Sequence, residues 1–341
     1  MNFKSDNVSG VSPAILDAVA AANRGAAASY GEDALTAGLE ARLAELFEHE
    51  VAVFPVATGT AANALALAAL TPPWGAVFCH GAAHIAVDEA NAPEFYTGGA
   101  KLVPLDGPDG KVPLALLAHH LPRGLGDVHH AQAAAISLTQ ATESGTLYRP
   151  GEIAALAELA HGHGCAVHMD GARFANAVVA LDAAPADITW RAGVDVLSFG
   201  ATKNGAMGAE AIVFFDRGLA RDLAFRRKRA GHLFSKMRFL SAQLDAYVTD
   251  GLWLANARHA NEQTRRLAEG LAAIPQIRFR FPAEANEIFA ELPLAMIEGL
   301  EAAGFEFYRW DGNCIRLVTH FDTDPAAVAR FVEMANALSI A

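Results

Sequence analysis

Cysteine is scarce in this 341-residue sequence, and the three that occur are odd in number and far apart: Cys79, Cys165 and Cys314. None of them forms a CxxC pair, so the sequence offers neither a disulfide framework nor a cysteine-based metal site. The first residues also lack the apolar stretch of a secretory signal. This pattern is typical of a reducing compartment, and we expect a cytoplasmic protein.

Positive charge is in short supply as well. The 26 Lys and Arg residues face 38 Asp and Glu residues, which gives a formal net charge of -12. A nucleic-acid-binding surface requires positive charge, so we expect no nucleic-acid partner. The basic run Arg226-Arg227-Lys228-Arg229 is a candidate phosphate contact, although such a run is usually a solvated helix face.

Long hydrophobic runs and metal-binding clusters are also missing. The most apolar stretch, residues 57–79, is interrupted by Asn63, two prolines and Gly75, so no membrane span is expected. Histidine pairs occur at 119–120, 129–130 and 161–163, but residues one or two apart do not share a helix face. No carboxylate or cysteine completes a ligand set with them, and we expect no metal site.

The sequence does contain a regular alternation of apolar, strand-length runs and helical stretches between residues 51 and 215. Such alternation predicts a mostly parallel sheet covered by helices on both faces, and therefore an α/β fold. Residues 219–271 are helical in pattern. Beyond Pro275, the sequence predicts a small α+β unit with strands at 287–292, 305–308 and 314–318 and helices at 293–303 and 325–338.

One apolar run, residues 194–199, ends in small residues and delivers Lys203 into a loop flanked by glycines. Desolvation of a lysine disfavours its charged form and yields a nucleophilic amine that can form a Schiff base. Taken alone, Lys203 is more often an ordinary surface lysine. Its partners elsewhere in the sequence decide between these interpretations.

Two further polar clusters follow predicted strands, where the ligand crevice of an α/β sheet lies. The turn Thr58-Gly59-Thr60 leads into a helix whose free N–H groups and dipole suit a phosphate, although it has no dinucleotide or P-loop fingerprint. Asp170 follows a second strand and either caps a helix or pairs with a protonated heterocyclic nitrogen. A phosphate turn, an aspartate and a lysine in this order are what pyridoxal 5'-phosphate requires.

With these residues, the sequence resembles the low-specificity L-threonine aldolases, which belong to the fold type I pyridoxal-phosphate enzymes. The resemblance runs from Phe3 to the strand ending at Thr319. It rests on ordered motifs: Ser5-Asp6-Asn7, Tyr30-Gly31, Thr58-Gly59-Thr60-Ala61-Ala62-Asn63, His84, His168-Met169-Asp170-Gly171-Ala172-Arg173 and Ser198-Phe199-Gly200-Ala201-Thr202-Lys203-Asn204.

The resemblance implies a role for each matched residue. Lys203 would form the Schiff base, Asp170 would hold the pyridinium nitrogen, and Arg173 would contact the phenolic oxygen. Gly59 and Thr60 would bind the phosphate. His84, by itself more often a helix-start or core residue, would stack on the cofactor ring and help to move protons. Ser5 and Arg316 would hold the α-carboxylate of the substrate, for which an arginine is well suited.

The general base is not settled by this resemblance. Many relatives carry Glu-Asn-Thr-His after the strand that here ends at Leu138, and that histidine is a candidate base. Here the sequence reads Thr139-Gln140-Ala141-Thr142-Glu143, and Thr142 stands in place of the histidine. The base for the substrate hydroxyl stays open among His84, Glu89, Thr142 and a phosphate-bound water.

The resemblance implies three parts: an N-terminal segment (1–30) contributing to the active site, a large pyridoxal-phosphate domain (31–250) with a mostly parallel seven-stranded sheet, and a small C-terminal α+β domain (251–341). It also implies a homotetramer with active sites shared between subunits, and which basic residue between 226 and 238 would reach a neighbour stays open. We expect reversible cleavage of L-threonine, L-allo-threonine or phenylserine-type amino acids to glycine and an aldehyde. The alternatives are a β-eliminating lyase, an aminotransferase or a non-catalytic binding module of this fold.

Overall fold

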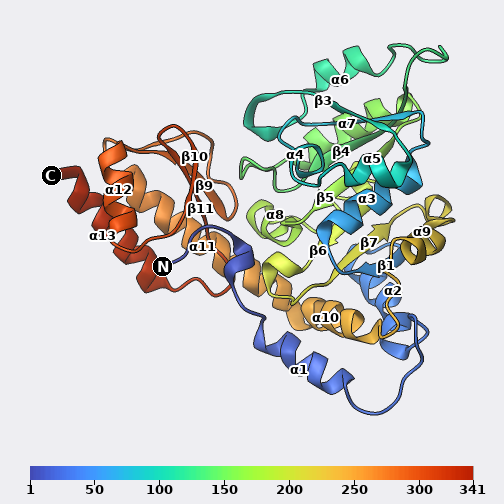
Figure 1. The fold of residues 1–341 in the computed structure, drawn as a ribbon, viewed down its shortest axis with the longest axis horizontal. Helices are drawn as coiled ribbons and strands as arrows, with labels where there is room; N and C mark the ends of the chain where they lie inside the picture. The colour runs from blue at the N-terminus through green and yellow to red at the C-terminus, as the bar shows by residue number, and fades with distance from the viewer. Residues whose placement is uncertain (341) are drawn as a thin grey trace.

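The larger of two sheets organises the computed structural model, which describes residues 1–340. Its seven strands lie in the order β1-β7-β6-β5-β4-β2-β3, and only β7 runs against its neighbours, as predicted for a mostly parallel sheet (Figure 1). The strands are β1 (Ala52–Val56), β2 (Gly75–Cys79), β3 (Lys101–Pro104), β4 (Gln132–Thr139), β5 (Ala166–Gly171), β6 (Val196–Gly200) and β7 (Glu210–Phe214).

Helices cover both faces of this sheet because alternate strand residues are apolar on each side. One face packs α3 against β1, β6 and β7, and the opposite face packs α2, α7 and α8 against β4 to β7. The helices of this part are α2 (Ala34–Phe47), α3 (Gly59–Leu70), α4 (His84–Val87), α5 (Ala92–Thr97), α6 (Leu114–His120), α7 (Pro150–Gly162), α8 (Phe174–Leu181), α9 (Leu223–Arg229) and α10 (Arg238–Val248).

A second, antiparallel sheet forms what we call the small-sheet unit, at the left of Figure 1. It consists of β8 (Arg278–Phe279), β9 (Glu287–Glu291), β10 (Tyr308–Asp311) and β11 (Cys314–Val318), with α12 (Leu294–Ala302) and α13 (Pro325–Ile340). The long helix α11 (Leu252–Ala272) packs against both α8 and α13 and so joins the two sheets. The domain boundary at residue 251 stays a prediction.

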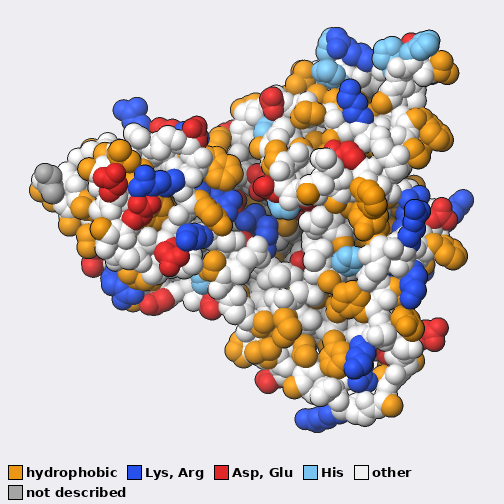
Figure 2. All heavy atoms as spheres, viewed as in Figure 1, with side chains coloured by type: hydrophobic (Ala, Val, Ile, Leu, Met, Phe, Trp, Pro, Cys, Tyr) orange, Lys and Arg blue, Asp and Glu red, His pale blue; other side chains and the backbone are white. Residues whose placement is uncertain are grey.

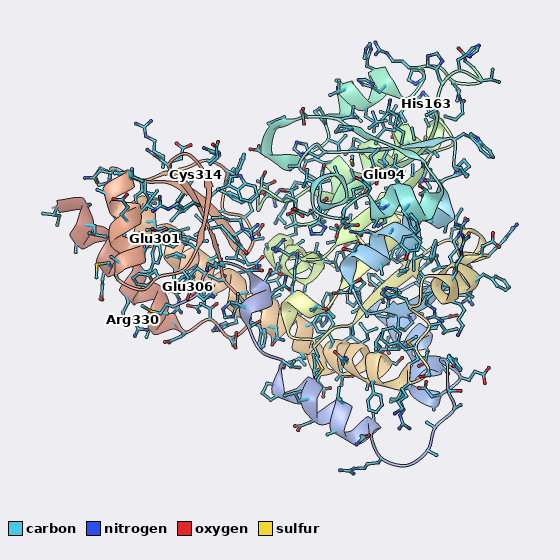
Figure 3. All side chains as sticks on the ribbon, viewed as in Figure 1. Glu94, His163, Glu301, Glu306, Cys314 and Arg330 are labelled. Carbon is cyan, nitrogen blue, oxygen red and sulfur yellow. The ribbon has the colours of Figure 1, made fainter. Side chains whose placement is uncertain are left out.

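One predicted strand is misplaced. We expected a strand at 305–308, but β10 begins at Tyr308. The reason lies in the N-terminal segment: Glu306 forms a bridge with Asn2, so the residues before β10 pair with the start of the chain. The N–H of Phe3 donates to Glu306 O at 2.7 Å, and Lys4 pairs with the Glu306 carboxylate at 2.9 Å. Figure 3 shows Glu306 on the small-sheet unit.

The N-terminal segment therefore crosses between the two units. Phe3 belongs to the small-sheet core, whereas the short turn η1 (Asp6–Val8) contacts the Lys203 loop and α1 (Pro13–Ala22) packs against α10. Within residues 1–340, all three cysteines are buried and unpaired, and Cys314 lies in the small-sheet unit (Figure 3). No helix of these residues is long and apolar enough to cross a membrane. They also contain no group of three or more side chains arranged to hold a metal ion.

Candidate active site

A cavity of about 300 Å³ lies where the carboxyl ends of β5 and β6 meet the start of α3. The polar residues of its wall are Asn7, Thr58, Thr60, Asn63, His84, Asp170, Ser198, Thr202, Lys203 and Glu210. Five of the eight predicted site residues thus lie in one wall: Gly59, Thr60, His84, Asp170 and Lys203. Figure 2 shows charged and histidine side chains around the hollow between the small-sheet unit and the larger one.

Lys203 is presented by the short turn η4 (Thr202–Asn204), directly after β6. Gly205 ends the turn with a φ of 114°, a conformation that a residue with a side chain rarely adopts. Asn204, which directly follows Lys203, anchors the turn. Its Nδ2 donates to Tyr247 Oη and to Trp253 O, both at 2.8 Å. The lysine is therefore fixed at its base while its side chain faces the cavity.

The phosphate turn predicted from the sequence forms the N-terminus of α3. Thr58 is the N-cap, and its Oγ1 accepts the N–H of Ala61 at 3.1 Å. Within residues 1–340, the N–H groups of Gly59 and Thr60 have no acceptor. A side chain added at Gly59 would meet nothing within 4 Å, so the glycine borders open space. Two free donors at a helix N-terminus beside open space suit an anionic group.

Asp170 ends β5 and is only 4% exposed. Its Oδ1 accepts the N–H of Ala172 at 3.0 Å, and its Oδ2 accepts from Asn63 Nδ2 at 2.9 Å. Beneath it, His168 bridges the hydroxyls of Ser137 and Ser198 inside the sheet, at 2.9 and 3.0 Å. Burial lowers the pKa of His168 to about 4, so this histidine is neutral at physiological pH and does not offset the charge of Asp170.

His84 begins α4 and reaches the cavity with a side chain that is one-third exposed (33%). Its Nδ1 lies 2.8 Å from Glu89 Oε1, and the Glu89 side chain is fully buried. The hydrogen bond to Glu89 raises the pKa of His84, against the lowering effect of burial. Glu89, one of the candidate bases, does not line the cavity, and it contacts the cavity wall through His84 and Asn63.

Arg173 lies at the start of α8, but its guanidinium is not part of the cavity wall. It pairs with Asp6 at 2.8 and 3.2 Å and with Glu287 at 2.9 Å, and all three side chains are buried. Burial opposes ionisation of Asp6, but Arg173 and Lys203 outweigh it and lower the pKa of Asp6. For Glu287 burial prevails, and its pKa is raised despite Arg173. A cofactor contact by Arg173 stays a prediction.

Ser5 and Arg316 also lie outside the cavity wall, although they are close to one another. Ser5 Oγ accepts the N–H of Asn7 and so caps η1, whereas Arg316 donates to the carbonyl of Lys4 at 3.2 Å. The Arg316 guanidinium rests on the rings of Tyr308 and Trp310, and its buried Nε has no partner within residues 1–340. This unpaired donor leaves Arg316 capacity to bind an anion.

Thr142 does not face the cavity. It is fully buried, and its hydroxyl bonds to Thr146 Oγ1 at 2.8 Å and to Asp109 O at 3.2 Å. Its role is to fix a turn, so it is not placed to act as a base.

The adjacent Glu143 is only partly buried, and its charge raises the pKa of His84, Arg173 and Glu287.

Glu210 is a site residue that the sequence analysis missed. This buried carboxylate lines the cavity, and its Oε2 accepts the N–H of Ala201 at 2.8 Å, with further hydrogen bonds from Thr202. Burial raises its pKa to about 7. An acidic residue at the head of the otherwise apolar run Glu210–Phe214 was the available signal.

The residues of the cavity fit pyridoxal phosphate. An amine, a buried carboxylate and a helix N-terminus with two free N–H groups face one space, and Gly59 leaves room at the phosphate end. The sheet topology and this site define the fold class of the fold type I pyridoxal-phosphate enzymes. More narrowly, the chain belongs to the beta-eliminating lyase family, whose sequence profile matches residues 2–293, and it is a lyase.

Individual relatives agree with this assignment. A low specificity L-threonine aldolase of Pseudomonas aeruginosa is 45% identical over 324 residues, which cover 94% of this chain and 93% of the relative. A second, from a Pseudomonas species, is 42% identical over 96% of this chain and 94% of its own. The solved structure of Leishmania major threonine aldolase superposes with a TM-score of 0.94 at 30% identity, covering 99% of both chains. The resemblance stated from the sequence motifs is confirmed.

Proposed function

We propose that this chain is a pyridoxal-phosphate-dependent low-specificity L-threonine aldolase. It cleaves L-threonine, L-allo-threonine and related β-hydroxy-α-amino acids, including phenylserine types, reversibly to glycine and an aldehyde. The observation that carries the proposal is the 45% identity to the Pseudomonas aeruginosa aldolase over nearly the whole of both chains. The cavity that combines Lys203, Asp170 and the start of α3 supports it.

The five predicted residues of the wall each have a task in this reaction. Bound pyridoxal phosphate would supply a carbonyl for an amine and a ring that draws electrons from the bonds at Cα. Lys203 would provide the amine, and the negative charge of Asp170 would keep the ring nitrogen protonated. The N–H groups of Gly59 and Thr60 would bind the phosphate. His84, one-third exposed in the wall, takes the proton of the β-hydroxyl.

The substrate carboxylate would be held at the edge of the small-sheet unit. Arg316 has a buried Nε without a partner, and two aromatic rings keep its guanidinium in place. Ser5, next to the contact of Arg316 with Lys4, offers a hydroxyl. Arg173, between Asp6 and Glu287, keeps the N-terminal segment and β9 together beside this site and would contact the phenolic oxygen of the cofactor.

A homotetramer with shared active sites completes the proposal. Lys203 is the only Lys or Arg in the described cavity wall, against Asp170 and Glu210, so a bound phosphate needs a further cation. The basic residues of α9 or the segment 236–238 from a neighbouring subunit would supply it. Exposed aromatic side chains suit such contacts between subunits, among them Trp74 (67%), Phe95 (77%) and Phe225 (79%). We place this enzyme in the cytoplasm.

Product analysis tests the proposal directly. The purified protein, supplied with pyridoxal phosphate, is incubated separately with L-threonine, L-allo-threonine and phenylserine. We expect glycine and the matching aldehyde in equal amounts. A keto acid with ammonia would contradict the aldolase assignment and favour β-elimination, and a new amino acid formed from an added keto acid would favour transamination.

A further inference from the structure

A chain of buried hydrogen bonds joins His84 to Asp170. Asn63, in the second turn of α3, is 2% exposed, and its Nδ2 donates to Glu89 Oε1 at 2.8 Å and to Asp170 Oδ2 at 2.9 Å. The side-chain amide has two N–H groups, one for each carboxylate. Glu89 Oε1 also lies 2.8 Å from His84 Nδ1. Four side chains from three parts of the chain are thus connected.

The contact with Glu89 assigns a role to each imidazole nitrogen. An ionised carboxylate only accepts hydrogen bonds, so with Glu89 Oε1 at 2.8 Å the proton of a neutral His84 belongs on Nδ1. The neutral His84 then has its lone pair at Nε2, the nitrogen left for the cavity. This tautomer is the one that a base in the cavity requires.

Burial of the Glu89 carboxylate lowers the stability of the fold, so its presence needs a reason other than packing. Glu89 has a fully buried side chain, its Oε2 has no partner within residues 1–340, and it shares one amide with a second carboxylate. An apolar side chain would fill this place without such a cost. Packing alone therefore does not account for Glu89, whereas control of His84 does.

We infer that Glu89 is a positioning residue of the aldol cleavage: it holds His84 with Nδ1 protonated and Nε2 toward the β-hydroxyl, and through Asn63 it ties His84 to Asp170. This inference rests on the proposed function. In the cleavage the hydroxyl proton passes to His84 Nε2, the Cα–Cβ bond breaks, and the aldehyde carbonyl forms. The electron pair of the broken bond stays at Cα. A proton added at Cα gives glycine, so the proton count balances without another reactant.

The charges around His84 set the expected pH dependence. Glu89, Asp170 and Glu143 all face it and raise its pKa, the hydrogen bond to Glu89 most strongly, while burial lowers it. Removing the charge of Glu89 therefore lowers the pKa of His84. Because a base works only when deprotonated, the acid limb of the kcat/KM profile moves to lower pH in Glu89→Gln. We also expect kcat to fall by about 10-fold to 100-fold, because the amide can donate to Nδ1 and favour the wrong tautomer.

Glu94→Gln is the matched control. Glu94 lies on the nearby helix α5 (Figure 3) and is not part of the cavity wall. Its Oε2 is buried and, like that of Glu89, has no partner within residues 1–340. A double substitution adds a second test: if Glu89 acts through His84, Glu89→Gln has no further effect on kcat in a His84→Asn background. Equal effects in both backgrounds would overturn the inference, as would a shifted acid limb in Glu94→Gln.

A readout without turnover separates this inference from the proposed function. In protein labelled with ¹⁵N-histidine, the signals of His84 are assigned by their absence in His84→Asn. We expect the Nδ1–H tautomer and a raised pKa in the unsubstituted protein, and a lower pKa in Glu89→Gln. The same tautomer and pKa in both proteins would overturn the role of Glu89. Absence of aldehyde from every substrate would overturn the aldolase proposal and leave the tautomer result standing.

Discussion

Asp6 Oδ2 lies 2.8 Å from Arg173 Nε, and neither side chain is more than 4% exposed. The pair joins the N-terminal segment to the start of α8, while Glu287 of β9 approaches the same guanidinium at 2.9 Å. Three segments that are distant in sequence therefore meet at one buried cation. The charge of Lys203 also helps to lower the pKa of Asp6, after the larger effect of Arg173, so this ion-pair cluster lies beside the Lys203 loop.

Removal of Asp6 should destabilise the fold strongly. In Asp6→Ala, Arg173 keeps its charge in a buried place and loses its best-aligned partner, which costs about 3–5 kcal/mol. Denaturant unfolding measures this loss. Glu306→Gln is the control, because its pair with Lys4 is about half exposed and such pairs contribute about 1 kcal/mol or less. A similar loss of unfolding free energy in both variants would mean that the buried ion pair of Asp6 contributes no more stability than an exposed one.

Acid should weaken the same contact. The pKa of Asp6 is lowered in the folded state, so its contribution to stability is present above the unfolded pKa of about 4 and is lost as pH falls below it. The free energy of unfolding should therefore fall more steeply with acid in the unsubstituted protein than in Asp6→Asn. Unfolding measured between about pH 6 and pH 3 tests this, and parallel curves would contradict it.

Much of the site follows from the sequence because of one property of parallel sheets. The strands that precede Thr58, His84, Asp170 and Lys203 all run in the same direction, so the residues after them meet at one edge of the sheet. Strand-length apolar runs with polar residues at their ends were enough to predict this for Thr58, Asp170 and Lys203, whereas His84 was predicted from the family resemblance. The lysine and the aspartate needed no knowledge of side-chain contacts.

The residues that the sequence analysis missed have a different geometry. Glu210 stands at the start of its strand, but β7 is antiparallel to β6, so its first residue lies opposite Gly200 at the same edge. Sequence patterns that consider only the residues after each strand therefore do not identify Glu210. The cluster of Asp6, Arg173 and Glu287 depends on how the small-sheet unit docks, which local patterns do not specify. The error at β10 has the same origin, since Glu306 pairs with the start of the chain.

The phosphate turn can be tested by filling its open space. Gly59→Ala adds a methyl group that meets no protein atom within 4 Å, so the fold should be unaffected while the methyl group intrudes on the ligand. We expect the dissociation constant of pyridoxal phosphate to rise by about tenfold, equivalent to about 1.4 kcal/mol. Binding to the apoprotein is followed by absorbance. Gly38→Ala, on the exposed face of α2 and equally free of contacts, should leave the affinity unchanged.

Lys203→Ala tests the covalent link. The unsubstituted protein with pyridoxal phosphate should show visible absorbance that borohydride abolishes, leaving the cofactor attached to the peptide that contains Lys203. The variant should show neither the borohydride effect nor aldehyde production. Lys101→Ala, at the exposed start of β3, should behave as the unsubstituted protein does. Cofactor trapped on another lysine, with activity kept in Lys203→Ala, would refute the assignment of the nucleophile.

Glu210→Gln should change how stability depends on pH. Burial raises the pKa of Glu210 to about 7 in the folded state from its ordinary value of 4.5, so the folded protein binds one more proton than the unfolded chain between these values. The stability of the unsubstituted protein therefore falls as pH rises through this window, by a total on the order of 3 kcal/mol. Glutamine keeps an acceptor for Ala201 but cannot ionise. Between about pH 5 and pH 8, the difference in unfolding free energy between Glu210→Gln and the unsubstituted protein should shift by that amount in favour of Glu210→Gln.

Glu158→Gln, on the exposed face of α7, serves as the control. A difference that does not vary with pH would mean that Glu210 is ionised throughout the range and that the Lys203 loop holds it as a carboxylate.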